Sequence, residues 1–174
     1  MKTLTDQLAQ YAAYHRDSRN IATHLIGIPM IVLAVSVLLA RLGLETGGLT
    51  LNAAQAVALV TGLYYLRLDA RLGVLMCALL GLAVAFGSWV AAMTATVWAL
   101  VGFGGFVVGW IIQFVGHAWE GRKPAFVDDL MGLVIGPLFV ACEVLFMLQL
   151  RLGLRDAIED RVGPARHRGR AGAH

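Results

Sequence analysis

Charged residues are scarce in this sequence, and their scarcity sets the class of protein. Only 14% of the 174 residues are Asp, Glu, Lys or Arg, whereas 59% are hydrophobic; soluble globular domains carry about 25% charged residues. Together with a mean hydropathy of +0.73, this composition excludes an ordinary soluble domain. Apolar runs recur at roughly the 17 to 25 residues that one membrane crossing needs, so we predict a polytopic integral membrane protein.

A cysteine framework and a cleavable leader are also lacking. The two cysteines, Cys77 and Cys142, lie inside apolar runs, which is typical of small buried side chains rather than of a disulfide or a redox pair. The N-terminus carries Asp6 and has no apolar core like that of a secretory signal, so we expect it to remain on the mature protein. The net charge of +3 comes mainly from an arginine-rich C-terminal segment, which we interpret as a membrane-surface tail that binds no nucleic acid.

The long apolar segments predict an all-α fold, a membrane helical bundle of four or five segments after a short amphipathic helix. The amphipathic helix is expected over residues 3–15, where Leu4, Leu8 and Tyr11 follow helical spacing. Pro29 should kink the first apolar segment, and residues 42–52 are expected to form a loop. The apolar segments cover approximately residues 18–41, 53–66, 72–93, 96–116 and 130–150.

The basic residues in the links predict the topology. They lie before the first segment, between the second and third, and after the fourth: Lys2, Arg16, Arg19, Arg67, Arg71, Arg122 and Lys123. By the positive-inside rule these links share the cytoplasmic side, which also brings His15, His24 and His117 to one membrane face.

Five full crossings would leave the basic tail on the opposite side. We therefore expect residues 130–150 to break at Gly132 and at Gly136-Pro137, or the short segment 53–66 not to span. Residues 1–150 are predicted to form one membrane-embedded catalytic domain, and residues 151–174 a basic cytoplasmic tail. In a bacterium the chain would lie in the inner membrane, with its N-terminus, its site and its tail facing the cytoplasm.

The three histidines outside the tail are candidate metal ligands. On one unbroken helix, His15 and His24 would lie about 180° apart, so they can share a site only if the chain turns near Asp17 and Ser18, which are N-cap residue types. Histidines with a nearby carboxylate suit iron, zinc or manganese. The remaining two histidines, His167 and His174, lie in the tail and are expected to be solvated.

Other polar residues are candidates for catalysis or substrate binding. Asn20 shares a helical face with His24, and Glu120 shares one with His117, so each is a candidate further ligand or support for a ligand. Glu143 stands inside an apolar segment, where a carboxylate is costly to bury and is either functional or a neutral, hydrogen-bonded group. Four basic residues are candidates for binding the carboxylate of an acidic amphiphile, besides setting topology: Arg16, Arg19, Arg122 and Lys123.

Two segments resemble the iron-dependent 2-hydroxy fatty acid dioxygenases, a membrane family first catalogued as a domain of unknown function. They are Y-H-R-D-S-R-N-I-A-T-H-L-I-G-I-P, residues 14–29, and Q-F-V-G-H-A-W-E-G-R-K-P-A, residues 113–125; G-P-L-F-V-A-C-E, residues 136–143, is a weaker third match. The resemblance covers roughly residues 5–150. It implies a membrane enzyme that uses Fe(II) and O₂, without 2-oxoglutarate, to shorten a 2-hydroxy fatty acid by one carbon with release of CO₂.

The same resemblance implies His15, His24 and His117 as the iron ligands, with Asn20 and Glu120 as further ligands or as their support. The residues alone leave other functions open: a small membrane haem protein with His24 and His117 as axial ligands for electron transfer, a structural membrane protein without metal, and a zinc hydrolase. The expected partners are the fatty acid, O₂ and membrane lipid, and the sequence does not predict an oligomeric state.

Overall fold

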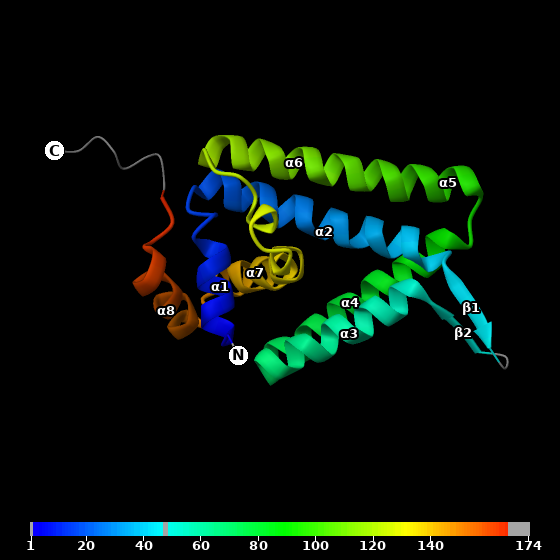
Figure 1. Cartoon of the computed structure of the whole chain (residues 1–174), viewed down its shortest axis with the longest axis horizontal. Coiled ribbons are helices and arrows are strands. Elements are labelled where there is room, and N and C mark those ends of the chain that lie inside the picture. Colours follow the sequence, from blue (N-terminus) through cyan, green and yellow to red (C-terminus); the bar gives the residue numbers. More distant parts are fainter. Residues whose placement is uncertain (1, 47–48, 167–174) are drawn as a thin grey trace. The chain divides into compact units, whose positions relative to one another are not determined.

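The structure, a computed structural model, describes residues 2–46 and 49–166, so His167 and His174 lie outside the described residues. It confirms the all-α, membrane-type bundle with a short N-terminal amphipathic helix (Figure 1). A π-helical turn, η1 (Leu100–Gly104), joins α5 to α6, and a 3₁₀ turn, η2 (Ala125–Val127), precedes α7. The α-helices are α1 (Leu4–Ala12), α2 (Ser18–Ala40), α3 (Ala53–Leu68), α4 (Ala70–Ala91), α5 (Ala95–Ala99), α6 (Gly105–Glu120), α7 (Met131–Met147) and α8 (Leu152–Val162).

Among the described residues, three helical stretches are long and apolar enough to cross a membrane. They are α2, α4 and the run Ala95–Glu120 that contains α5, η1 and α6; α7 and α8 make a fourth only if this pair, bent by 116°, counts as one span. The 16 residues of α3 rise about 24 Å, which is less than the hydrocarbon thickness of about 30 Å. The apolar segment predicted at 53–66 is therefore a short helix.

The predicted break in the last apolar segment is wrong in its position. α7 is continuous through Gly132, Gly136 and Pro137, because one missing backbone hydrogen bond does not break a helix whose sides are packed. The chain bends sharply only after Met147, where Gln149 and Arg151 adopt positive φ angles of 61° and 58°.

The loop predicted at 42–52 is also wrong, because this stretch forms an antiparallel hairpin. Strand β1 (Gly43–Thr46) pairs with β2 (Leu49–Asn52), with Leu44 opposite Leu51. The sequence contains the signal, since leucine and threonine alternate through β2 as they do in strands. Asn52 then caps α3 by accepting a hydrogen bond from the backbone N–H of Gln55.

The chain folds into two compact units. The first comprises Met1–Ile28 and Ile111–His174, and the second comprises Pro29–Trp110. In the second unit, glycines permit close packing: a Cβ on Gly73 would lie 2.5 Å from the backbone of Leu66, and a Cβ on Gly87 would lie 2.6 Å from the carbonyl oxygen of Ser36. α2 runs through the boundary between the units as one helix, with Pro29 inside it.

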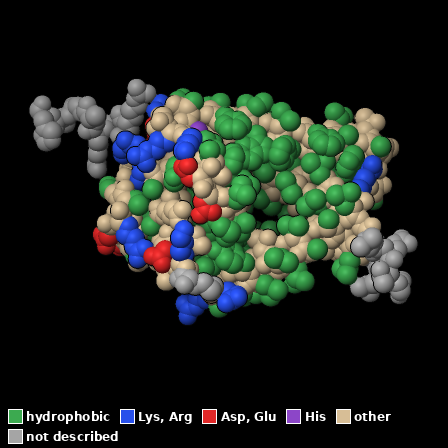
Figure 2. Space-filling model, in the orientation of Figure 1, with side chains coloured by type: hydrophobic (Ala, Val, Ile, Leu, Met, Phe, Trp, Pro, Cys, Tyr) green, Lys and Arg blue, Asp and Glu red, His purple; other side chains and the backbone are tan. Residues whose placement is uncertain are grey.

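The first unit contains the candidate site. α1 is capped by Thr3 and Asp6, and it packs with its buried face against α7 and α8. Sequence reasoning did not predict α8, which an ion pair between Arg161 and Asp6 ties to α1. Charged side chains gather around α1 and α8, whereas hydrophobic side chains cover much of α5 and α6 (Figure 2).

Candidate metal centre

The predicted turn between His15 and His24 is present. α1 ends at Ala12 and α2 begins at Ser18, so the chain turns between the two helices, and the two buried imidazoles lie together. Their Nε2 atoms are 2.9 Å apart, whereas an unbroken helix would have placed them on opposite faces.

The hydrogen bonds of the two rings determine where their protons lie. His15 Nδ1 is 2.7 Å from the carbonyl oxygen of Tyr11, and His24 Nδ1 is 2.8 Å from that of Asn20. Because a carbonyl oxygen can only accept, both Nδ1 atoms carry the proton, and a neutral ring then keeps a lone pair on Nε2. The pKa of His15 lies well below its ordinary value of 6.5, mainly because the ring is buried, which agrees with a neutral ring. The two Nε2 lone pairs therefore lie 2.9 Å apart, and a cation bound beside both of them would remove their repulsion.

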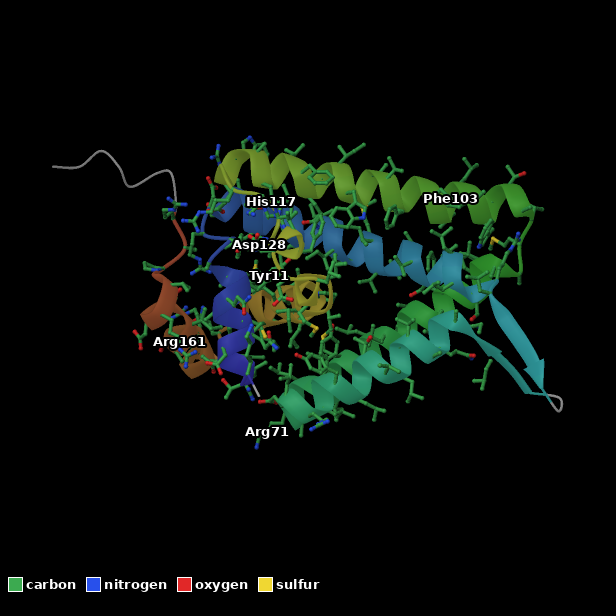
Figure 3. All side chains as sticks on the ribbon, in the orientation of Figure 1. Tyr11, Arg71, Phe103, His117, Asp128 and Arg161 are labelled. Carbon is green, nitrogen blue, oxygen red and sulfur yellow. The ribbon has the colours of Figure 1, made fainter. Side chains whose placement is uncertain are left out.

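His117 completes the cluster from the last turn of α6 (Figure 3). Its ring centroid is 5.0 Å from those of both His15 and His24, and one ligand nitrogen from each of the three residues lies within 4.8 Å of the others. The buried Nδ1 atom of His117 has no hydrogen-bond partner within the described residues. The three donors form a group that could hold a metal ion; neighbouring nitrogens around an ion with bonds of about 2.1 Å would be about 3 Å apart.

Glu120 stabilises the turn between α1 and α2, which contains His15. Its Oε2 atom accepts hydrogen bonds from the backbone N–H groups of Arg16, at 3.0 Å, and Asp17, at 2.7 Å, and from Asn20 Nδ2, at 3.2 Å. Its Oε1 atom accepts one from Arg166 at 2.9 Å. The carboxylate therefore holds the turn that follows His15, and it does not belong to the group of possible ligand atoms found among residues 2–46 and 49–166; its support of a metal ligand stays a prediction.

Sequence reasoning missed Gln113. Its side chain is buried, and its Nε2 atom has no hydrogen-bond partner in the described part of the chain. It precedes His117 by four residues, so the two share one face of α6. A glutamine within an apolar segment, one turn from a candidate ligand, was the signal that could have found it.

Comparison with known proteins places this chain in a family. The family model described as "2-hydroxy-palmitic acid dioxygenase Mpo1-like" matches residues 1–148. The chain belongs to this Mpo1-like family. It is 33% identical over 159 residues to the 2-hydroxy-palmitic acid dioxygenase MPO1 of Saccharomyces cerevisiae, covering 90% of this chain and 87% of the yeast protein. No solved structure matches the chain. The resemblance inferred from the segments around the histidines is thus confirmed, and it supports a related dioxygenase function.

In this Mpo1-like protein, the four candidate carboxylate-binding residues all have partners within the chain. Arg16 and Arg122 donate to backbone carbonyl groups, Arg16 by three hydrogen bonds. Arg19 and Lys123 form ion pairs with neighbouring aspartates at 2.7 Å and 2.6 Å. These contacts give each side chain a structural role, and substrate binding by any of them stays a prediction.

Glu143 was the candidate carboxylate inside an apolar segment of this family member. It is half-buried on α7 and interacts electrostatically with Arg16, which follows His15. The group of possible ligands found in the described residues does not include it. Its role in orienting a histidine stays a prediction.

Proposed function

We propose that this protein is an Fe(II)-dependent dioxygenase that shortens 2-hydroxy fatty acids by one carbon, without 2-oxoglutarate. The reaction is R–CH(OH)–COOH + O₂ → R–COOH + CO₂ + H₂O. The bond between C1 and C2 breaks, the two carbon atoms together lose four electrons, and O₂ accepts them. No other oxidant or reductant is needed.

The observation that carries the proposal is the pair of lone-pair-bearing Nε2 atoms of His15 and His24, 2.9 Å apart, in a chain of the Mpo1-like family. Neutral imidazoles with a hydrogen-bonded second nitrogen are common metal ligands in enzymes. The yeast relative is named for 2-hydroxy-palmitic acid, which supports a 2-hydroxy fatty acid as the substrate class.

In this proposal, His15, His24 and His117 hold the iron. The ion supplies a centre at which O₂ and the two oxygen-bearing groups of a 2-hydroxy carboxylate can meet. The carbonyl oxygens of Tyr11 and Asn20 keep the first two rings oriented.

We also propose that residues 1–150 form the catalytic domain and that the N-terminus, the site and the tail face the cytoplasm. The proposal rests on the positive-inside rule, applied to the links that contain Lys2, Arg67 and Arg122. Labelling of single cysteines placed in these links, in intact cells and in inverted vesicles, tests the sidedness. Labelling of all three links from the outside of intact cells would refute it.

The geometry favours a small ion over the haem alternative. A haem would need His24 and His117 on opposite faces of a porphyrin plane. The ring centroid of His15, however, lies 4.3 Å from that of His24 and 5.0 Å from that of His117. The His15 ring therefore occupies the space that a porphyrin plane between His24 and His117 would need. A purified protein with a Soret band and no non-haem iron would nevertheless decide for haem.

The direct test combines elemental analysis with turnover. We expect stoichiometric iron in the purified protein and conversion of 2-hydroxypalmitate under O₂ into the acid that is one carbon shorter. Replacing His15, His24 or His117 by alanine should abolish both, whereas Asp160→Ala, at an exposed position of α8, is the control. Absence of bound iron, or intact substrate after incubation with Fe(II) and O₂, would overturn the proposal; stoichiometric zinc with hydrolytic activity would identify a hydrolase.

A further inference from the structure

Two buried amides beside the histidines present polar atoms without partners. Asn20 is 0% exposed and Gln113 is 3% exposed. Within the described residues, neither Asn20 Oδ1 nor Gln113 Nε2 has a hydrogen-bond partner. Buried polar groups in folded proteins are nearly always paired, so a bound group that satisfies both atoms is the simplest reason for the pair.

The orientation of the Asn20 amide is determined by its surroundings. Its Nδ2 atom donates to Glu120 Oε2, at 3.2 Å, and lies 3.4 Å from the carbonyl oxygen of Tyr14. Both partners are acceptors, so this atom is the nitrogen and the other is the oxygen. The oxygen faces the last half of α6, because a Cβ built on Gly116 would lie only 2.5 Å from it.

Gln113 lies on the same face of α6. It precedes Gly116 by three residues and His117 by four, and residues at these spacings are neighbours about 5–6 Å apart between Cβ atoms. Asn20 Oδ1 thus contacts α6 at Gly116, and this face of the helix also carries the two other unpaired atoms, Gln113 Nε2 and His117 Nδ1. Asn20 Oδ1 can only accept a hydrogen bond, and Gln113 Nε2 can only donate one.

We propose that Asn20 and Gln113 bind the hydroxyl group on C2 of the substrate. Gln113 Nε2–H donates to the hydroxyl oxygen, and the hydroxyl proton is donated to Asn20 Oδ1. A hydroxyl group satisfies both atoms because it accepts and donates at once. A carboxylate or a ketone lacks the proton, and an unsubstituted C2 lacks both functions. The inference rests on the proposed function and adds the residues that select a 2-hydroxy acid over an unsubstituted one.

The test measures binding rather than turnover. Purified protein in lipid nanodiscs is equilibrated under nitrogen with 2-hydroxypalmitate, palmitate or 2-fluoropalmitate, and its iron content is determined in the same preparation. Gln113→Met removes the donor at similar side-chain size, and Ile111→Met, at an exposed position of α6, is the matched control. We expect Gln113→Met to bind 2-hydroxypalmitate about tenfold more weakly, as for the loss of one hydrogen bond, with unchanged palmitate affinity and iron content.

Equal weakening for palmitate and 2-hydroxypalmitate would assign Gln113 a structural role and overturn the inference. No weakening would overturn it too, since the amides would then hold a buried water only. The wild-type protein alone provides a second test if the variant does not fold: 2-fluoropalmitate, which has no O–H, should bind like palmitate, and binding like 2-hydroxypalmitate would refute the inference. An iron-free, inactive wild type would instead defeat the proposed function itself.

Discussion

Replacement of Glu120 by alanine should destabilise the protein even when no metal is bound. The carboxylate side chain is 1% exposed, whereas that of its partner Arg166 is 70% exposed, so the outer ion pair contributes little. Loss of the three inner hydrogen bonds would leave their donors without an acceptor: the backbone N–H groups of Arg16 and Asp17 and the Asn20 amide. At about 1–2 kcal/mol for each after relaxation, the expected loss is about 3–6 kcal/mol. Glu120→Gln keeps one acceptor oxygen and should lose about 1–2 kcal/mol.

The assay is unfolding of the metal-free protein in detergent by heat or denaturant, with iron content measured in parallel. Asp160→Asn is the matched control, because Asp160 is an exposed carboxylate on α8. A Glu120→Ala protein should unfold at a lower temperature without metal and should also retain less iron. If it retains no iron but its metal-free form is as stable as the wild type, Glu120 is a metal ligand and the positioning role is refuted.

Three further perturbations test other contacts of the first unit and its helices. Gly116→Ala would place a Cβ 2.1 Å from a threonine hydroxyl of α2, so we expect this variant to contain less iron by elemental analysis. Gly104→Ala is the control, because a Cβ there would meet open space, and it should leave the iron content unchanged. The pKa of Asp6 lies below its ordinary value of 3.8, chiefly because Arg161 donates to it. The attachment of α8 to α1 should therefore be complete at neutral pH and weaken as the pH falls below about 4, which hydrogen exchange of α8 can measure. Arg166→Ala should change the unfolding free energy by less than about 1 kcal/mol, and a larger loss would mean that this exposed pair is stronger than its surroundings suggest.

The turn between His15 and His24 could be predicted from the sequence. Helical geometry separates two residues nine positions apart, and Asp17 and Ser18 are residue types that begin helices. The membrane class and most helix positions followed from composition and from the length of the apolar segments. These features depend on local chemistry, which a single sequence carries.

The role of Glu120 could not be predicted, because its partners are mainly backbone N–H groups, and every residue except proline has one. Its position three residues after His117 suggested a ligand or its support, but the sequence could not distinguish them. Gln113 did carry a signal, as a glutamine within an apolar segment, but its burial follows from how α6 packs, which the sequence does not show. Likewise, Arg16 and Arg122 donate to carbonyl groups of residues distant in the chain, which no spacing rule reveals.

The hydrogen bond between Asn20 and Glu120 joins residues that are 100 positions apart, and this separation has a consequence for biosynthesis. At a translation rate of about 5–20 residues per second, α6 follows the start of α2 into the membrane after roughly 5–20 s. During that interval His15 and His24 are already made, while His117 and the carboxylate that fastens the turn are not. In the proposed enzyme, the nascent chain would have all three histidines for the iron only after the end of α6 has been made, so metal loading would follow the synthesis and insertion of that helix.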